Sequence, residues 1–252
     1  MNARQKKILE FLARDGEVLV QDLAKRLDVV TMTVRRDLQA LELEGALIRT
    51  HGGAALSNAG IIEFAFLKKN EENNAEKRAI ASRVAASIEP GMTVGLDTGT
   101  TCLEVAKAIA GIPNLKVLTS SLAIASALYS RDNIELVLLG GKARRGNPDL
   151  TGWLTEENLK HFRVDVAVLS ADAADKKGLY TTDEALAHVS QGIIASAHKA
   201  ILAADHSKFD KSSFLLHATW QDFHQVVTDA GLPADKRRWL QQVAKNVLYA
   251  EL

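Results

Sequence analysis

The chain has 252 residues, a length that allows one large domain or a small domain joined to a medium one. Hydrophobic residues make up 47% and charged residues 25%, which is typical of a folded globular protein and excludes disorder as the main state. The 31 basic and 31 acidic side chains cancel. Net charge alone therefore gives no indication of a nucleic-acid partner, and any basic surface must be local.

No run of apolar residues approaches the roughly 18 that a membrane-spanning helix needs, and the N-terminal residues lead into no apolar signal segment. The single cysteine, Cys102, can form neither an internal disulfide nor a thiolate metal site. None of the 7 histidines has the spacing of metal ligands. We therefore expect a cytoplasmic protein with no membrane anchor and no metal site.

Residues 1–56 contain three short segments with helical apolar periodicity, followed by a hairpin pattern. In the third segment, which begins near Thr31, a stripe of apolar residues recurs at helical spacing and must pack inward. Leu47–Thr50 is predicted to be a strand, and Gly52 and Gly53 supply the turn of the hairpin. The pattern predicts a small domain of three helices and a hairpin.

Two short helices, a tight turn and an exposed third helix are the parts of a helix-turn-helix, in which the third helix lies in the major groove. Arginines on that helix can bind phosphates or guanine edges, and the hairpin would be a wing against the DNA backbone. The alternative is a small helical module whose arginines are only solvated, and periodicity alone leaves both open. The candidate DNA-binding residues are Thr31, Met32, Thr33, Arg35, Arg36, Gln39, Arg49 and His51.

Residues 57–74 are predicted to be a linker with some helix around residues 64–67. Beyond it, helices alternate with short apolar strands, which predicts an α/β domain over residues 75–252 with a doubly wound, mostly parallel sheet. The expected helices are 75–87, 101–110, 122–129, 182–197 and 234–244. The expected strands are 93–96, 116–118, 135–139, 165–169, 200–204, 225–227 and 246–249.

In such a sheet, ligands bind beyond the carboxyl ends of the strands. The loops expected there are rich in hydroxyls, glycines and carboxylates, and one carries a lysine. Backbone amides, hydroxyls and a cation suit a phosphate, while carboxylates suit sugar hydroxyls. We therefore predict a phosphorylated sugar or polyol as ligand, held by the segments Asp97–Thr101, Thr119–Ser121, Gly140–Lys142, Ser170–Asp175 and Asp205–Lys208. Arg144 and Arg145 could reach a phosphate, but we expect that loop to be exposed to solvent.

Three N-terminal segments resemble the winged helix-turn-helix of the DeoR family of bacterial transcriptional regulators. They are Arg4-Gln5-Lys6-Lys7-Ile8-Leu9, Thr33-Val34-Arg35-Arg36-Asp37-Leu38 and Arg49-Thr50-His51-Gly52-Gly53-Ala54. The chain departs from the family at Val30, where members usually have a serine that caps the recognition helix. We expect Thr31 to provide the cap instead.

The C-terminal part resembles the sensor domain of the same family. The matching segments are Asp97-Thr98-Gly99-Thr100-Thr101, Thr119-Ser120-Ser121-Leu122, Gly140-Gly141 and Asp205-His206-Ser207-Lys208-Phe209. The resemblance implies a domain related to sugar-phosphate isomerases such as ribose-5-phosphate isomerase, which binds a phosphorylated sugar and so modulates DNA binding. It places Gly99, Thr100, Thr101 and Lys208 on the phosphate, and Asp97, Asp175 and Glu184 toward the sugar.

Three positions depart from the sensor-domain pattern: Ser170, Ala173 and Asp210 stand where members usually have glycine. The surroundings of Glu184 do not align with the family pattern, so its role is left open. The resemblance implies a repressor of a carbohydrate operon that binds operator DNA and needs no cofactor besides its sugar-phosphate effector. Because a single winged module makes a small DNA interface, we expect a homo-oligomer, either a dimer or a tetramer, that reads repeated half-sites. The alternative is an isomerase-like enzyme, in which Asp97, Asp175 or Glu184 is the general base.

Overall fold

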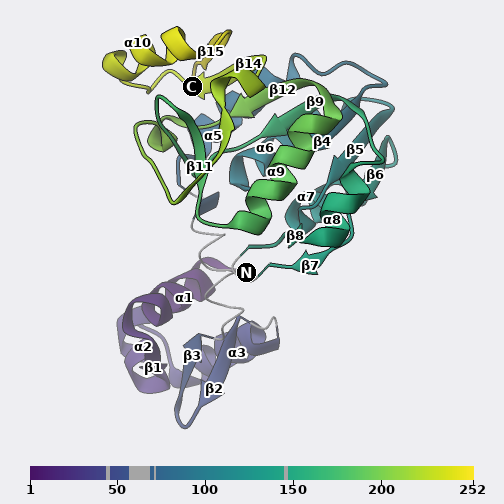
Figure 1. Cartoon of the computed structure of the whole chain (residues 1–252). Coiled ribbons are helices and arrows are strands. Elements are labelled where there is room, and N and C mark those ends of the chain that lie inside the picture. Colours follow the sequence, from purple (N-terminus) through teal and green to yellow (C-terminus); the bar gives the residue numbers. More distant parts are fainter. Residues whose placement is uncertain (44–45, 57–68, 71, 145–146) are drawn as a thin grey trace. The chain divides into compact units, whose positions relative to one another are not determined.

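The computed structural model describes residues 1–43, 46–56, 69–70, 72–144 and 147–252 (Figure 1). The chain divides into two compact units, of which the first contains Met1–Lys69 and the second contains Asn70–Arg144 and Pro148–Leu252. Most of the expected linker, including the helix expected around residues 64–67, lies outside the described residues. Within the described ranges, no helix is both long and apolar enough to span a membrane.

The first unit packs three helices against a small antiparallel sheet. The helices are α1 (Ala3–Asp15), α2 (Val20–Leu27) and α3 (Thr31–Leu43), and the strands β1 (Glu17–Leu19), β2 (Leu47–Thr50) and β3 (Gly53–Leu56) are ordered β1-β3-β2. The predicted inward stripe of α3 is buried, with Val34, Leu38 and Leu41 all at 0% exposure. The helices and the hairpin are therefore as the sequence predicted, whereas β1 was missed because three residues are too few to show a period.

The two adjacent glycines of the hairpin have different structural reasons. Gly52 has a φ of +88°, a left-handed conformation that glycine adopts without strain. At Gly53, a Cβ atom would lie 2.2 Å from the carbonyl oxygen of Val18. Gly53 pairs with Leu19 of β1, so only a glycine allows β1 to approach β3 this closely.

The beginning of α3 differs from the expectation. Thr31 is the first helical residue, and the carbonyl oxygen of Val30 accepts the first bonds of the helix, from the amides of Thr33 at 3.0 Å and Val34 at 3.4 Å. The capping position is therefore Val30, whose side chain has no acceptor for the free amides of the first turn. The expectation that Thr31 is the cap was wrong by one residue.

In the second unit, seven parallel strands among the described residues form one sheet, in the order β15-β14-β12-β9-β4-β5-β6. They are β4 (Thr93–Leu96), β5 (Leu115–Thr119), β6 (Ile134–Leu138), β9 (Val164–Leu169), β12 (Ala197–Ala203), β14 (Gln225–Asp229) and β15 (Val247–Ala250). The helices are α5 (Asn74–Ala85), α6 (Thr100–Ile109), α7 (Leu122–Leu128), α8 (Trp153–Leu159), α9 (Glu184–Ser196) and α10 (Ala234–Val243).

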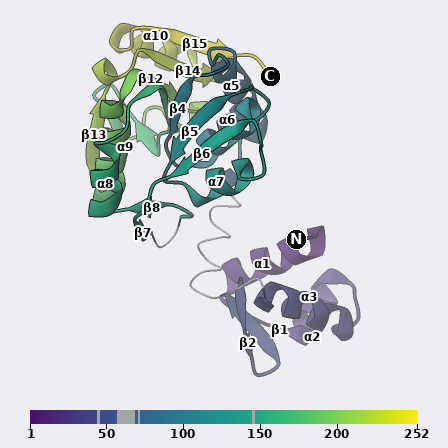
Figure 2. The same cartoon turned by 90° about the vertical axis from the view of Figure 1, so that its right-hand side faces the viewer.

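The strand order reverses direction between β4 and β9. From β4 the chain moves outward through β5 to β6, and from β9 it moves the other way through β12 and β14 to β15. Right-handed crossovers then put the connecting helices on opposite faces. Figure 2 shows α5, α6 and α7 on one side of the sheet and α8 and α9 on the other. The predicted doubly wound α/β architecture is confirmed, with its switch point between β4 and β9.

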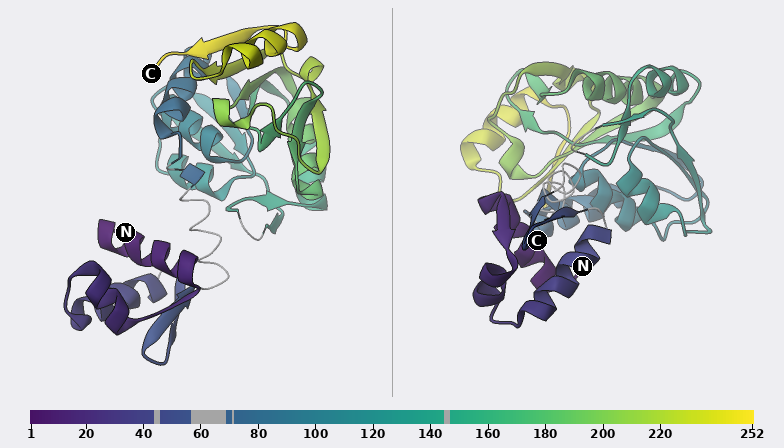
Figure 3. Two further views of the ribbon diagram at one scale, coloured as in Figure 1. Left: turned by 90° about the vertical axis from the view of Figure 1, so that its left-hand side faces the viewer. Right: turned by 90° about the horizontal axis from the view of Figure 1, so that it is seen from below.

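The predicted helices and strands of this unit are all present, with ends shifted by up to three residues. The sequence missed α8, because its seven residues form less than two turns and bury few side chains. It also missed the short strands outside the large sheet. These are β7 (Lys142–Ala143) with β8 (Leu150–Thr151), and an antiparallel sheet of β10 (Ala173–Ala174), β11 (Gly178–Thr181) and β13 (Leu215–Thr219). Figure 3 shows the second unit from two further sides, with the yellow C-terminal elements at one end.

The core of the first unit can be tested with two leucines of α3. Leu38 is completely buried, whereas Leu43 is 83% exposed on the same helix. Leu38→Ala is expected to lower the free energy of unfolding of this unit by about 2–5 kcal/mol, because it leaves a cavity. Leu43→Ala should change it by less than about 0.5 kcal/mol. Urea unfolding followed by circular dichroism measures both values, and equal effects would contradict the packing described.

Candidate functional site

The outward face of α3 carries the predicted DNA-binding side chains. Met32 is 56% exposed, and Thr31, Arg35, Arg36 and Gln39 are exposed, with Thr33 half-buried. Among the described residues, no side chain forms a hydrogen bond or ion pair with the guanidinium groups of Arg35 and Arg36. An α-helix with an exposed polar face of this kind is the element that a helix-turn-helix inserts into the major groove.

Asp37 lies in the same motif but has a different role. It is 5% exposed, and its carboxylate forms an ion pair with the guanidinium of Arg4 on α1, with a second contact from Arg4 Nη2 at 3.3 Å. The hydrogen bond to Asp37 raises the pKa of Arg4. This pair therefore holds together two of the segments that carry the family resemblance, and it fixes α3 against α1.

The hairpin presents two further predicted residues. Arg49 is exposed on β2 and its Nε donates to the carbonyl oxygen of Gly53 at 3.3 Å. His51 is exposed in the turn between β2 and β3. Both side chains lie on the part of the unit that a winged helix uses against the DNA backbone or the minor groove.

In the second unit, five loops begin at one edge of the sheet because the strands that precede them are parallel. Asp97 follows β4, Ser120 follows β5, Gly140 follows β6 closely, Ser170 follows β9 and Asp205 follows β12. The structure thus brings the predicted effector segments to one rim, which includes Gly99, Thr100, Thr101, Thr119, Ser121, Gly141 and Lys208. We call this set of residues the rim site.

The loop after β4 is shaped by close contact with the loop after β9. Gly99 has a φ of +101°, and a Cβ atom there would lie 2.6 Å from Ser170 Oγ. Ser170 donates to the carbonyl oxygen of Thr98 at 2.9 Å. Thr100 and Thr101 then begin α6, to which no described side chain gives a cap. The first amides of α6 are therefore available to an anion.

Asp97 lies at the switch point of the sheet and is 4% exposed. Its Oδ2 accepts a hydrogen bond from Ser190 Oγ on α9 at 3.0 Å. Burial raises the pKa of Asp97 to about 7, against the opposing effect of hydrogen bonds from Thr98 and Ser190 and with help from the nearby charges of Asp149 and Asp172. Its Oδ1 is buried and has no partner among the described residues. Near neutral pH, this carboxyl can therefore either donate to or accept from a ligand.

Two of the three hydroxyls at the carboxyl end of β5 have structural partners. Ser121 caps α7, because its Oγ accepts from the amide of Ile124 at 3.3 Å. Thr119 Oγ1 accepts from the amide of Ser121 at 3.1 Å. Ser120 is completely buried, and its Oγ has no partner in the described part of the chain. Ser120 is therefore the hydroxyl of this loop that is best suited to a ligand.

The two glycines after β6 serve close packing. Thr155 of α8 donates from its Oγ1 to the carbonyl oxygen of Gly140 at 2.7 Å. A Cβ atom on Gly141 would lie 2.9 Å from the carbonyl oxygen of Thr151 and closer still to Thr155 Oγ1. These contacts place α8 and β8 against the rim.

The expectation of an exposed arginine loop was wrong for Arg144, while Arg145 lies outside the described residues. The Arg144 side chain is 15% exposed and pairs with Asp149 and Asp183. Its Nε and Nη2 donate to the two oxygens of Asp149 at 2.8 and 2.7 Å. Asp183 in turn caps α9, the helix that carries Ser190. The ion pair thus connects the β7–β8 segment to the helix that contacts Asp97, and nothing in the local sequence signals it.

The other two carboxylates predicted to face the sugar lie in different surroundings. Asp175 is in the turn between β10 and β11, where its carboxylate accepts from the amide of Lys177 at 2.7 Å and from Tyr180 Oη at 3.1 Å. Glu184 is exposed at the first position of α9. Asp97 is therefore the carboxylate of the three that is buried at the switch point of the sheet.

The segment Asp205–Asp210 is anchored by the aromatic core. Phe209 is completely buried, and its ring centroid lies 6.4 Å from that of Trp220 and 6.3 Å from that of Trp239. Lys208 is half-buried beside it. Asp210, which replaces the usual glycine, has a φ of +62°. Aspartate tolerates this left-handed conformation better than most residues, which explains how the loop keeps its shape without the glycine.

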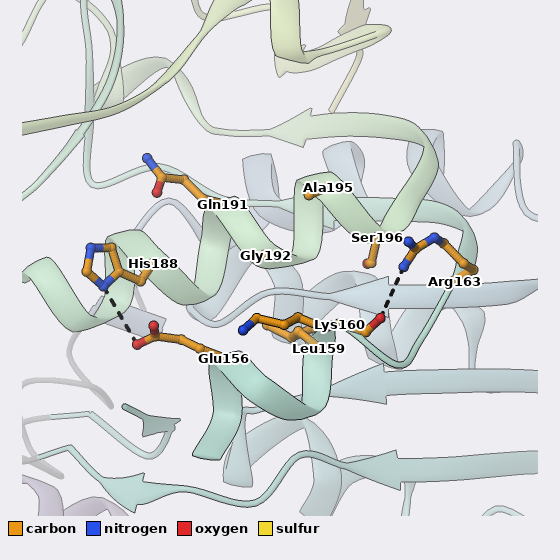
Figure 4. Close-up of a pocket in the computed structure, with 9 residues that line it drawn as sticks. All are labelled: Glu156, Leu159, Lys160, Arg163, His188, Gln191, Gly192, Ala195 and Ser196. Atoms are coloured by element: carbon orange, nitrogen blue, oxygen red, sulfur yellow. Dashed lines mark hydrogen bonds and ion pairs between the residues drawn. The ribbon is translucent and has the colours of Figure 1, made fainter. Parts of the chain in front are cut away.

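Two further features lie away from these residues. A groove of about 440 Å³ lies between α8 and α9, lined by Glu156, Leu159, Lys160, Arg163, His188, Gln191, Gly192, Ala195 and Ser196 (Figure 4). It includes no predicted effector residue.

In the part of the chain that the structure describes, no cluster of histidine, cysteine or carboxylate side chains could hold a metal ion.

Comparison with known proteins gives the same division of the chain. Residues 4–59 match the family model of the DeoR-like helix-turn-helix domain, and residues 72–230 match that of the DeoR C-terminal sensor domain. The transcriptional repressor AccR of Agrobacterium fabrum is 36% identical over 230 residues, covering 90% of this chain and 89% of that protein. The glycerol-3-phosphate regulon repressor of Escherichia coli is 30% identical over 231 residues, covering 91% of each.

Among solved structures, ribose 5-phosphate isomerase A of Methanocaldococcus jannaschii aligns over 55% of each chain, with a TM-score of 0.41 and 17% sequence identity. The two family models together cover most of the chain, and the relatives are similar over nearly their whole length. The chain therefore belongs to the DeoR family of transcriptional regulators.

Proposed function

We propose that this protein is a repressor of a carbohydrate operon that binds operator DNA through α3 and the β2–β3 hairpin, and whose affinity for DNA changes when a phosphorylated sugar or polyol binds at the rim site. The observation that carries the proposal is that one chain contains both a helix with exposed arginines and a loop suited to binding an anion. Arg35 and Arg36 are exposed on α3, and uncapped α6 amides lie at the switch point of an α/β sheet. One relative is named for the regulon of a phosphorylated polyol, which supports this class of effector.

The chemistry of the rim site supports the same ligand class. The α6 amides, Thr100 and Thr101 would hold the phosphate, with Lys208 assisting. Asp97 Oδ1 and Ser120 Oγ are buried and lack partners in the described structure, and sugar hydroxyls would satisfy both. The site would bind its ligand without converting it, as in a regulator. Incubation with aldose and ketose phosphates, with the products followed by chromatography, should detect no interconversion.

A single winged domain makes a small DNA interface, so useful specificity favours a homo-oligomer that reads repeated half-sites. The direct test is binding of the purified full chain to DNA from upstream of its own gene, at fixed salt, with and without a panel of sugar phosphates. Tight binding that one compound alters would support both halves of the proposal. No binding beyond that of a non-specific fragment would overturn it.

For the DNA-binding half, Arg35→Ala and Arg36→Ala are each expected to weaken operator binding by about 1–3 kcal/mol, because each removes a phosphate or base contact. The fold should persist, since both side chains are exposed. Arg14→Ala is the control, because Arg14 pairs with Asp15 at the end of α1. Fluorescence anisotropy with labelled operator measures the effect. Full operator affinity in both α3 variants would contradict the assignment.

For the effector half, Gly99→Ala is expected to abolish ligand binding, since its φ is unfavourable for alanine and its Cβ would meet Ser170 Oγ. At a ligand concentration of 100 times the dissociation constant, the wild type should gain about 2.7 kcal/mol, seen as a higher melting temperature. Gly111→Ala is the control, because a Cβ there meets nothing within 4 Å. An unchanged ligand-induced shift in Gly99→Ala would argue against this loop as the phosphate site.

The raised pKa of Asp97 predicts a pH dependence of stability. Between the unfolded value near 3.8 and the folded value of about 7, the folded chain holds a proton that the unfolded chain has lost. The free energy of unfolding therefore falls as pH rises through this window, by about 1.4 kcal/mol per pH unit from this group. Asp97→Asn should remove this pH-dependent part of the free energy of unfolding, whereas Asp132→Asn, at an exposed position, should leave it unchanged. Urea unfolding across the window measures both, and parallel curves for wild type and Asp97→Asn would contradict the prediction.

A further inference from the structure

Asp205 connects two segments of the second unit that lie 132 residues apart in the chain. It is completely buried, and its Oδ1 accepts from the amide of Ser207 at 3.0 Å and from Asn73 Nδ2 at 2.9 Å. The first bond is within the loop that carries Lys208. The second reaches the residue immediately before α5. One carboxylate oxygen therefore joins the loop to the start of α5.

Asn73 does not act as an ordinary helix cap. An asparagine before a helix usually has an extended backbone, and its side-chain oxygen accepts from an amide of the first turn. Asn73 instead has a left-handed backbone, with a φ of 50° and a ψ of 39°, and makes no side-chain capping bond. Its amide group is directed to Asp205 instead. In this conformation the Asn73 side chain does not cap α5 and instead contacts the loop that carries Asp205.

The first turn of α5 is tied into the same buried region. Lys77 is 1% exposed, and its Nζ donates to the carbonyl oxygen of Glu72 at 2.6 Å. Burial alone would raise the pKa of Asp205, but hydrogen bonds from Ser207 and the charges of Lys208 and Lys77 lower it. The carboxylate is therefore ionised between two cations, one on the loop and one on α5.

The opposite side of the loop has its own anchor. Asp229, at the end of β14, accepts from the amide of His206 at 2.7 Å and pairs with His206 Nδ1 at 2.8 Å. This anchor is part of the sheet. Asn73, by contrast, lies only four positions after Lys69, where the N-terminal segment of the first unit, Met1–Lys69, ends. A change in the loop can therefore be passed to the place where the chain enters the second unit.

We propose that Asp205 is a positioning residue that transmits ligand binding at Ser207–Lys208 to residues 72–77 through its hydrogen bond with Asn73. The proposal rests on the proposed function, since it needs an anionic ligand at Lys208. A ligand that orders the loop lowers the cost of keeping the bond between Asn73 and Asp205, so the first turn of α5 opens less often. By reciprocity, loss of that bond loosens the loop.

Hydrogen exchange of the full chain, followed by mass spectrometry, tests this with saturating inorganic phosphate as the probe. In the wild type, phosphate should slow exchange both in the loop, residues 205–210, and in the first turns of α5, residues 74–80, roughly fivefold or more. Asn73→Gly removes the amide group and tolerates the left-handed backbone. In this variant phosphate should slow exchange in the loop alone.

Asn74→Ala is the matched control. Asn74 is the neighbouring asparagine, and its Nδ2 donates to the carbonyl oxygen of Asn70 at 3.1 Å without touching Asp205. It should keep the response of both segments to phosphate. Loss of the α5 response in Asn73→Gly but not in Asn74→Ala would support the role of Asp205.

The outcomes separate this proposal from the proposed function. If phosphate protects the loop of the wild type but not residues 74–80, the role of Asp205 is overturned while ligand binding at the rim stands. If phosphate protects neither segment, ligand binding is in question, and the unliganded variants decide the role of Asp205. Faster exchange at 205–210 in Asn73→Gly than in Asn74→Ala then supports it, and equal exchange overturns it.

Discussion

The reversal of strand order between β4 and β9 is the constraint on which the second unit depends. Because the chain leaves these neighbouring strands in opposite directions, the connections that follow them cross opposite faces of the sheet, and ligands of doubly wound folds bind at such a point. Asp97 and Ser170 stand at this point, and Ser170 packs directly over Gly99. The helices on the two faces then follow from the handedness of the crossovers. Because this position is buried, the pKa of the Asp97 carboxyl is raised to about 7.

Several residues that carry the family resemblance have structural roles. Asp37 pairs with Arg4 and fixes α3 to α1. Gly53 allows β1 to approach β3, and Phe209 anchors the Lys208 loop in the aromatic core. The exposed face of α3 and the rim are thus presented by a framework that the same motifs build, which explains why residues that cannot touch a ligand are part of the recognisable pattern.

The fold was largely predictable because its signals are local. The inward stripe of α3 recurs at helical spacing, and the strands of the large sheet are short apolar runs separated by helices, which is typical of a sheet buried on both faces. The elements that the sequence missed, α8 and the strands β7, β8, β10, β11 and β13, are too short to show a period. The cap of α3 was misplaced by one residue, because Val30 gives no sequence signal for a cap.

The sequence by itself determined the two-part organisation, the family, and the loops that would meet at one edge of the sheet, because parallel strands bring their carboxyl ends together whatever the details of packing. Only the tertiary structure decided which of those side chains are already engaged. Arg144 pairs with Asp149 and Asp183, and Asp175 closes its own turn. Asp205 bonds to Asn73, far away in the chain. Such partners depend on contacts between distant segments, and residue type and spacing do not encode them.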